Sequence, residues 1–198
     1  MDKDKKKVYF GIKKCYIAPV IKITDEGVPT FGEPVAVPGA VSLKLSPQGD
    51  TTKKYADDVT FWTGVSNQGY TGVLELMLLS DEVKTTILNY VKDGKGVLYE
   101  DSQAQPKKFA LLFEANTDAK PMRYVFYNCI ATRPEEEHKT VEEKIDPGTM
   151  SIDIEIAQIY IKDLDIWTAH TVTTDETDET VYKNWYSVVY MPTKGIGG

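Results

Sequence analysis

Apolar and polar residues alternate along much of this sequence, and this alternation constrains the fold more than any other feature. The clearest case is the range 150–161, where Ile152, Ile154 and Ile156 alternate with Asp153 and its acidic or polar neighbours. Because successive side chains of a strand point to opposite faces, the pattern predicts a strand with one buried face.

The same reasoning predicts strands throughout the chain. They cover 8–10, 14–23, 28–37, 40–45, 72–79, 97–100, 108–114, 122–133 and 150–161. The fold class expected from this pattern is mainly β: a β-sandwich or a partly closed barrel with one flanking α-helix and a long inter-strand loop or arm.

The one predicted helix begins at Ser80 or Asp81, since either side chain can accept hydrogen bonds from the amides of a first helical turn. Four apolar residues then recur at helical spacing and should dock the helix on the sheet. They are Val83, Ile87, Leu88 and Val91. Asp93-Gly94 is expected to end the helix.

The range 46–70 is too long and too polar for a plain connection between strands. It nevertheless contains Tyr55, Phe61 and Trp62, and such aromatics are unusual in disordered segments. We therefore expect a hairpin or an arm that packs on another surface.

Composition limits the classes of function. The 198 residues suit a single domain spanning 1–198, with a core of about 8–162 and a C-terminal extension of about 163–198. With 23 basic and 30 acidic residues the net charge is −7, which argues against wrapping nucleic acid. No apolar run approaches about 18 residues, and the first residues lack the features of a signal peptide, so we expect no membrane association.

Catalytic and metal-binding motifs are not evident. The sequence lacks a phosphate-binding glycine loop and a nucleophile elbow, and it has only two histidines and two cysteines. Adjacent carboxylates, such as Asp57 with Asp58, are typical of solvated loops rather than of glycosidase pairs. We therefore expect no enzyme activity, no cofactor and no metal.

Aromatic residues in polar surroundings are the better functional candidates, since Trp and Tyr bury large areas while keeping a polar group. We expect six residues to form an inter-subunit interface: Tyr55, Phe61, Trp62, Tyr70, Trp185 and Tyr186.

Ordered segments of the chain resemble one known family. They are FGIKKCYIAP (10–19), FGEPVAVPGAVSLKLSPQGDTTKKYADD (31–58), NQGYTGVLELMLLSDEV (67–83), GVLYEDSQAQPKKFALLFE (96–114) and YVFYNCIATRP (124–134). In this order and spacing they resemble the major tail proteins of long-tailed phages, of the phi13-type family. The resemblance runs from near residue 8 to about residue 160. The segment VYKNWYSVVYMP (181–192) is similar to an extension of some members.

The resemblance implies a structural protein of the virion, assembled in the host bacterial cytoplasm. Tail tube subunits of this kind form rings, usually six-fold, that stack into a tube around the tape-measure protein and later conduct DNA. The implied partners are other copies of the chain, the tape-measure protein, and the tail terminator and initiator or distal tail proteins. DNA would pass through the lumen without specific binding. The alternative from the residues alone is a carbohydrate-binding or adhesin β-module.

Overall fold

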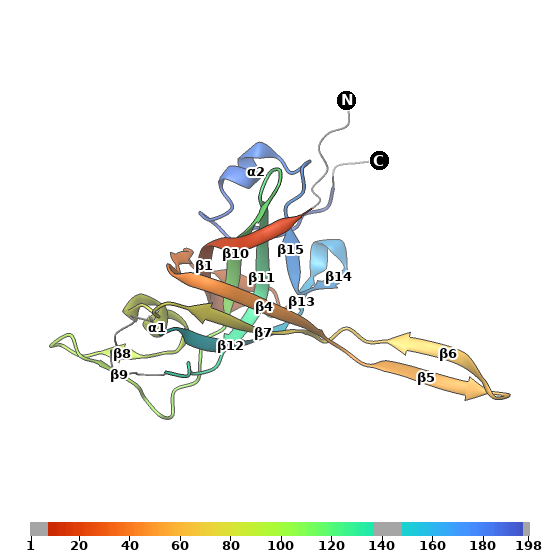
Figure 1. Cartoon of the computed structure of the whole chain (residues 1–198), viewed down its shortest axis with the longest axis horizontal. Coiled ribbons are helices and arrows are strands. Elements are labelled where there is room, and N and C mark those ends of the chain that lie inside the picture. The colour runs from red at the N-terminus through yellow and green to blue at the C-terminus, as the bar shows by residue number, and fades with distance from the viewer. Residues whose placement is uncertain (1–7, 137–147, 196–198) are drawn as a thin grey trace, which may run out of the picture.

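A computed structural model describes residues 8–136 and 148–195 and confirms the mainly β prediction (Figure 1). Its main element is a nine-stranded antiparallel sheet with the strand order β2-β1-β10-β11-β12-β7-β4, in which β3 also pairs with β1 and β15 with β11. The strands are β1 (Tyr9–Ile23), β2 (Pro29–Phe31), β3 (Val35–Ala36), β4 (Ala40–Gln48), β7 (Gly69–Leu76), β10 (Phe109–Thr117), β11 (Met122–Ala131), β12 (Met150–Ala157) and β15 (His170–Val172). Within the described residues the sheet does not close into a barrel.

Three short hairpins and three helical segments complete the described chain. The hairpins are β5 (Thr51–Ala56) with β6 (Val59–Val65), β8 (Val91–Lys92) with β9 (Leu98–Tyr99), and β13 (Ile159–Ile161) with β14 (Ile166–Thr168). The helical segments are α1 (Asp81–Ile87), the 3-10 turn η1 (Lys162–Leu164) and α2 (Glu179–Lys183).

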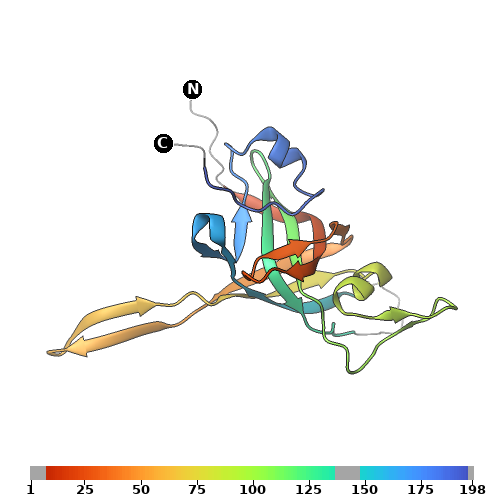
Figure 2. The same cartoon turned by 180° about the vertical axis from the view of Figure 1, so that it is seen from behind.

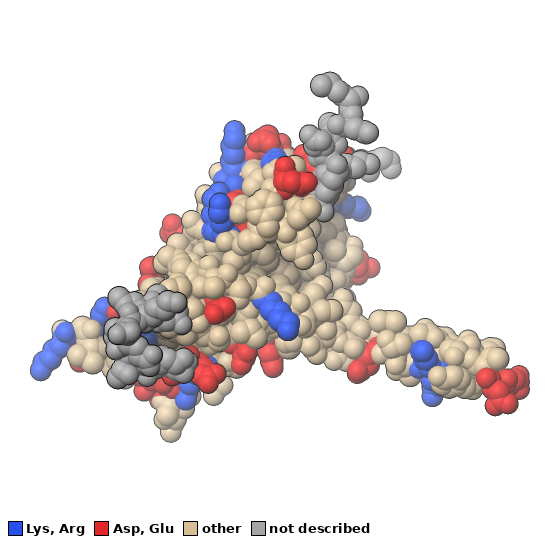
Figure 3. Space-filling view, in the orientation of Figure 1, with Lys and Arg blue, Asp and Glu red and all other residues tan. Residues whose placement is uncertain are grey.

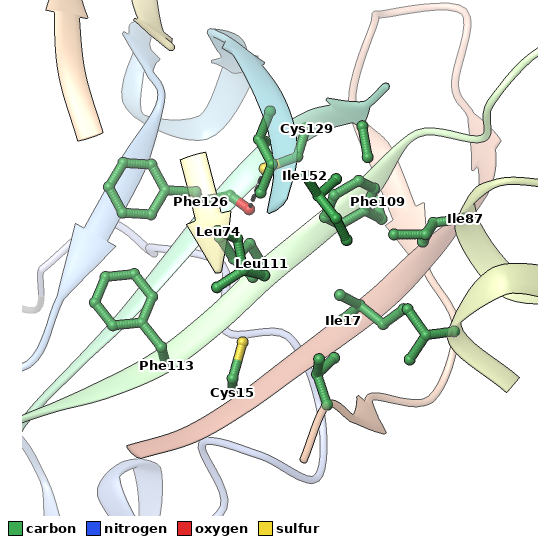
Figure 4. Packing of buried hydrophobic residues seen from close by; sticks show 14 of the residues in the cluster. Cys15, Ile17, Leu74, Ile87, Phe109, Leu111, Phe113, Phe126, Cys129 and Ile152 are labelled. Carbon is green, nitrogen blue, oxygen red and sulfur yellow. Dashed lines mark hydrogen bonds between the residues drawn. The ribbon is translucent and has the colours of Figure 1, made fainter. Parts of the chain in front are cut away.

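The main core lies between two halves of the bent sheet. Residues of β1 and β10, such as Ile17 and Leu111, meet residues of β7 and β12, such as Leu74 and Ile152 (Figure 4). The predicted alternation in β12 is confirmed, because Ile152, Ile154 and Ile156 are buried while the residues between them are exposed. The small cavity in this core holds about 10 Å³, which is too little for a ligand.

A second apolar cluster covers the opposite face of β1, β10 and β11. Ala18, Ala110 and Leu112 pack there against Trp185 and Val189 of the C-terminal segment. Strand β10 is therefore buried on both faces, which explains why its first five residues, FALLF (109–113), are a continuous apolar run rather than an alternation. Figure 2 shows the segment with α2 lying over this end of the sheet.

Helix α1 begins as predicted but ends earlier. The Ser80 hydroxyl accepts a hydrogen bond from the Val83 amide at 3.3 Å, and Val83, Ile87 and Leu88 are buried. The expected place of Val91 on the helix is wrong, because Val91 is exposed in β8. The chain leaves the helix at Asn89, whose φ of 62° is left-handed, rather than at Asp93-Gly94.

The C-terminal segment contains elements that the sequence did not predict, including β14, β15 and α2. The acidic residues 173–180 form a turn and loop that lead into α2, and the helix begins at Glu179. The Asp178 carboxylate accepts hydrogen bonds from the amides of Thr180 and Val181, at 2.8 and 3.1 Å. These bonds lower the pKa of Asp178. A second helix is thus added to the single helix expected.

Among the described residues, no helix has the length and apolar character needed to span a bilayer. A second acidic stretch spans residues 134–147, and its residues 137–147 lie outside the described residues.

Candidate assembly surfaces

Strands β5 and β6 form an arm that extends far from the rest of the molecule (Figures 1 and 2). The arm continues the pairing of β4 with β7, which runs to Gln48 opposite Gly69. At its base, the Ser66 amide donates to the Asp50 carbonyl at 2.9 Å, and the Asp50 amide donates to the Ser66 hydroxyl at 2.9 Å. The arm is therefore an extension of the core sheet, as expected for the range 46–70, and not an unstructured loop.

The arm exposes large aromatic side chains. Tyr55, Phe61 and Trp62 are 68%, 80% and 53% exposed. In the arm's register Trp62 lies opposite Lys54 and Tyr55 lies opposite Thr60, and the pairing is irregular between these two pairs, at Phe61. A side chain exposed in this way gains little from an isolated subunit but can bury its area against another protein.

The Trp62 ring lies across Gly64. A Cβ atom added at position 64 would come within 2.1 Å of the Trp62 ring atom Cη2, so glycine leaves the space that the ring occupies. The indole is thus positioned by its own strand while 53% of the residue stays exposed.

Tyr70 lies at the base of the arm and packs within its own subunit. Its ring meets Phe126 and His170 edge-on, with centroids 5.6 Å away in both cases. The structure therefore places Tyr70 apart from the three exposed aromatics of the arm. Burial lowers the pKa of His170, which also stacks on Phe126.

Trp185 and Tyr186 lie far from the arm, in the segment that covers the second cluster. Trp185 is only 2% exposed, and its indole nitrogen donates to the Tyr124 carbonyl at 3.3 Å. Tyr186 stacks on Tyr16 with ring centroids 4.8 Å apart. Both residues thus pack within the subunit here, and their place in an inter-subunit interface stays a prediction.

A buried charged cluster fastens this C-terminal segment. The Glu114 carboxylate accepts a hydrogen bond from Arg123 Nε at 2.9 Å and contacts Lys14 Nζ at 3.3 Å. The Arg123 guanidinium also donates to the Tyr182 carbonyl and lies 3.7 Å from the centre of the Tyr182 ring. Arginine suits this position because its planar group forms ion pairs and stacks on aromatic rings at once.

The outer edge of β4 is a further candidate surface. This strand ends the sheet path, so within the described ranges its second edge lacks a paired strand. Such an edge presents amide and carbonyl groups that can pair with a strand of another chain. Val41, on β4, is among the exposed large apolar residues.

Groups capable of chemistry are inaccessible or scattered. Cys15 and Cys129 are buried free thiols; burial raises the pKa of Cys15 to about 12 and that of Cys129 still further. Neither is therefore a thiolate at neutral pH. In the part of the chain that the structure describes, no group of three or more His, Cys, Asp or Glu residues could hold a metal ion.

Two further features were missed as interface candidates. Asp57 and Asp58 form the tip of the arm, and Lys13 and Lys14 border a hollow on the core. An Asp-Asp pair between two strand-like runs is a recognisable turn signal, whereas nothing in the sequence shows that 12–16 and 36–40 enclose a hollow.

Comparison with known proteins gives a likeness of fold. No family model matches the sequence, and no curated protein matches it. One similar solved structure is the cap of the anti-feeding prophage, described as a tube terminating cap, with 12% identity, 86% of this chain and 96% of that chain covered, and a TM-score of 0.47. Another is a chain of the six-fold symmetrised baseplate of the anti-feeding prophage, with 6% identity, coverage of 82% and 94%, and a TM-score of 0.38.

Proposed function

We propose that the chain is a structural subunit of a phage-type tail, with the more specific role of a major tail protein. Copies of it assemble into stacked, six-fold rings that form the tail tube around a tape-measure protein. Tail terminator and initiator or distal tail proteins bound the tube, and DNA passes through the lumen. The protein is thus part of the virion, is assembled in the host bacterial cytoplasm, and acts as one domain.

The observation that carries this proposal is the arm. It exposes Tyr55, Phe61 and Trp62, and a subunit working alone would gain nothing from holding them in water. Contacts with neighbouring copies bury all three. The free edge of β4 offers a second contact of a different kind, by strand pairing.

The sequence gives further support for a structural role. The ordered resemblance of residues 8–160 to phage major tail proteins agrees with a mainly β subunit that carries an arm.

Electron microscopy of the purified chain at high concentration tests the proposal. We expect rings or tubes. In a matched variant, Asn-Gly replaces residues 51–65, because Asp50 and Ser66 are already hydrogen-bonded and a two-residue turn can join them. This armless variant should keep the melting temperature of the parent and fail to form tubes. Tubes built by the armless variant would contradict the role assigned to the arm.

The alternative function is a carbohydrate-binding or adhesin module. It is favoured by one observation, the exposed Trp62 ring held across Gly64, because aromatic rings of this kind can stack on sugars. Glycan binding by a monomer that never forms rings, lost in a Trp62→Ala variant, would support this function and overturn the tail proposal.

A further inference from the structure

The tip of the arm is built in an unusual way. Asp57 and Asp58 form its two-residue turn, and both have left-handed φ angles, of 49° and 61°. Turns of this kind favour Asn-Gly or Asp-Gly, because glycine takes positive φ without a steric penalty. Here two carboxylates occupy both positions, and both are exposed at the far end of the molecule, where Figure 3 shows an acidic end to the arm.

These carboxylates have no role within the described part of their own subunit. Neither has a hydrogen bond or an ion pair there, and a hairpin of this length projects them about 20 Å from the sheet. Tyr55 and Phe61 lie within three residues of this turn along the two strands and are strongly exposed. The end of the arm therefore combines two negative charges with exposed aromatic side chains.

A hollow of complementary character lies on the core, between β1 and the connection from β3 to β4. It has a volume of about 250 Å³ and is lined by 12–16 and 36–40. Its lining includes apolar groups such as Ile12, Val37 and Ala40. Small-molecule sites usually measure roughly 300–1,000 Å³, so this hollow suits one or two protein side chains better.

Lys13 gives the lining of the hollow a positive charge. The pairing of β1 with β10 is irregular between Lys13 and Tyr16, and this irregularity leaves the successive residues Lys13 and Lys14 both exposed. The ammonium of Lys14 is paired within its own subunit, because it contacts the buried Glu114 at 3.3 Å and lies over the Tyr186 ring. A chain of net charge −7 thus carries a local basic site beside an apolar hollow.

We propose that the Asp57–Asp58 tip of one copy docks in the hollow of a second copy, with its carboxylates beside Lys13. This inference rests on the proposed function, because it requires copies of the chain to meet. The occupant is another copy because the acidic tip and the basic hollow complement each other in charge, and the same chain carries both. Such a contact is heterologous, since tip and hollow are different surfaces, and it therefore propagates from copy to copy.

Charge exchange tests the docking in the full-length chain. The Asp57→Asn/Asp58→Asn variant removes both charges and keeps residues that tolerate the left-handed turn. The Lys13→Glu variant reverses the charge that residue 13 gives the lining of the hollow, and it keeps the contact between Lys14 and Glu114. Each should raise the protein concentration needed for assembly about tenfold or more. Combining Asp58→Lys with Lys13→Glu should recover most of this loss. A combination that assembles no better than Lys13→Glu alone would overturn the docking.

The matched control uses the β1–β2 hairpin, which carries an exposed lysine on β1 and an exposed aspartate in its turn. Lys22→Glu and Asp25→Lys change the net charge by the same amounts but lie outside the tip and the hollow. They should leave assembly within about threefold of the parent. Unchanged melting temperatures in all variants establish that the subunits remain folded.

Disulfide cross-linking separates this inference from the proposed function. Cys15 and Cys129 are buried, so cysteines introduced at the surface react selectively. Ala36→Cys with Ala56→Cys keeps the charges of the tip and of Lys13 and should give a ladder of covalent oligomers on oxidation, whereas Thr30→Cys with Ala56→Cys should not. Tubes without this ladder overturn the docking and leave the proposed function in place. A ladder without rings or tubes overturns the proposed function and supports the docking, and the absence of both overturns the two together.

Discussion

At the scale of single residues, Glu114 is a buried carboxylate that depends on its charged partners. Its side chain is 5% exposed and would lie in the interior as an unpaired charge without Arg123 and Lys14. Removing one partner of a buried ion pair usually destabilises a protein far more than the pair itself contributes, because the remaining charge loses its compensation.

Arg123→Ala should therefore lower the free energy of unfolding by about 3 kcal/mol, at the lower end of the range for broken buried pairs, since Lys14 remains. Urea denaturation measures this change. Arg133→Ala is the matched control, because Arg133 pairs with Glu100 at the surface and such pairs contribute about 0–1 kcal/mol. Equal losses in the two variants would contradict the structural role of the buried pair.

His170 gives the fold a dependence on pH. Burial lowers its pKa below the usual value near 6.5, so the folded state favours the neutral ring stacked on Phe126. The unfolded chain then binds more protons as the pH falls through this region, and stability is lost toward acid.

We expect the melting temperature to fall between pH 7.5 and pH 5.5, and His170→Phe to reduce this fall while keeping an aromatic ring beside Phe126. An identical pH response in the parent and in His170→Phe would show that His170 does not contribute to it.

At the scale of elements, helix α1 shows what local sequence can and cannot predict. Its start at Ser80 was predictable, because capping depends on a few adjacent residues. Its end was not, because the helical spacing continues to Val91 although the backbone turns left-handed at Asn89. The buried face of the helix is therefore shorter than the apolar stripe in the sequence.

Leu88→Ala should lower the free energy of unfolding by about 2–5 kcal/mol, since it removes a buried side chain from the main core. Val91→Ala should change it by less than about 0.5 kcal/mol, because Val91 is exposed in β8. Urea denaturation of the two variants distinguishes the observed helix from the longer one expected from the spacing; a large loss for Val91→Ala would favour the longer helix.

Strands and candidate surfaces also differ in how far the local sequence predicts them. The long strand β12 was predictable from its alternation, whereas β14 and β15 have three residues each, too few to show a pattern. The exposure of Tyr55, Phe61 and Trp62 was predictable from their polar surroundings. The burial of Trp185 was not, because polar neighbours in sequence do not reveal that the segment folds back over β10 and β11.

At the scale of the whole molecule, the packing of the C-terminal segment bears on whether this segment and the core unfold in one transition or in two. The sequence suggested a core of about 8–162 followed by an extension, but Trp185 and Val189 form part of the second cluster with Ala18 and Leu112. The Tyr127 hydroxyl also donates to the Tyr190 carbonyl at 2.9 Å. Since removal of the segment would expose one face of β10, we expect the segment and the core to unfold together.

Tryptophan fluorescence can test this expectation, because the three tryptophans lie in separate places. Trp62 is on the arm and Trp167 is exposed on β14, so a Trp62→Phe/Trp167→Phe variant leaves Trp185 as the only reporter. In urea, its fluorescence and the far-ultraviolet circular dichroism of the sheet should change with the same midpoint and slope, as a two-state transition requires. A Trp185 transition at lower urea than that of the sheet would mean that the extension detaches first, and the second cluster would then be a docking contact rather than part of one cooperative core.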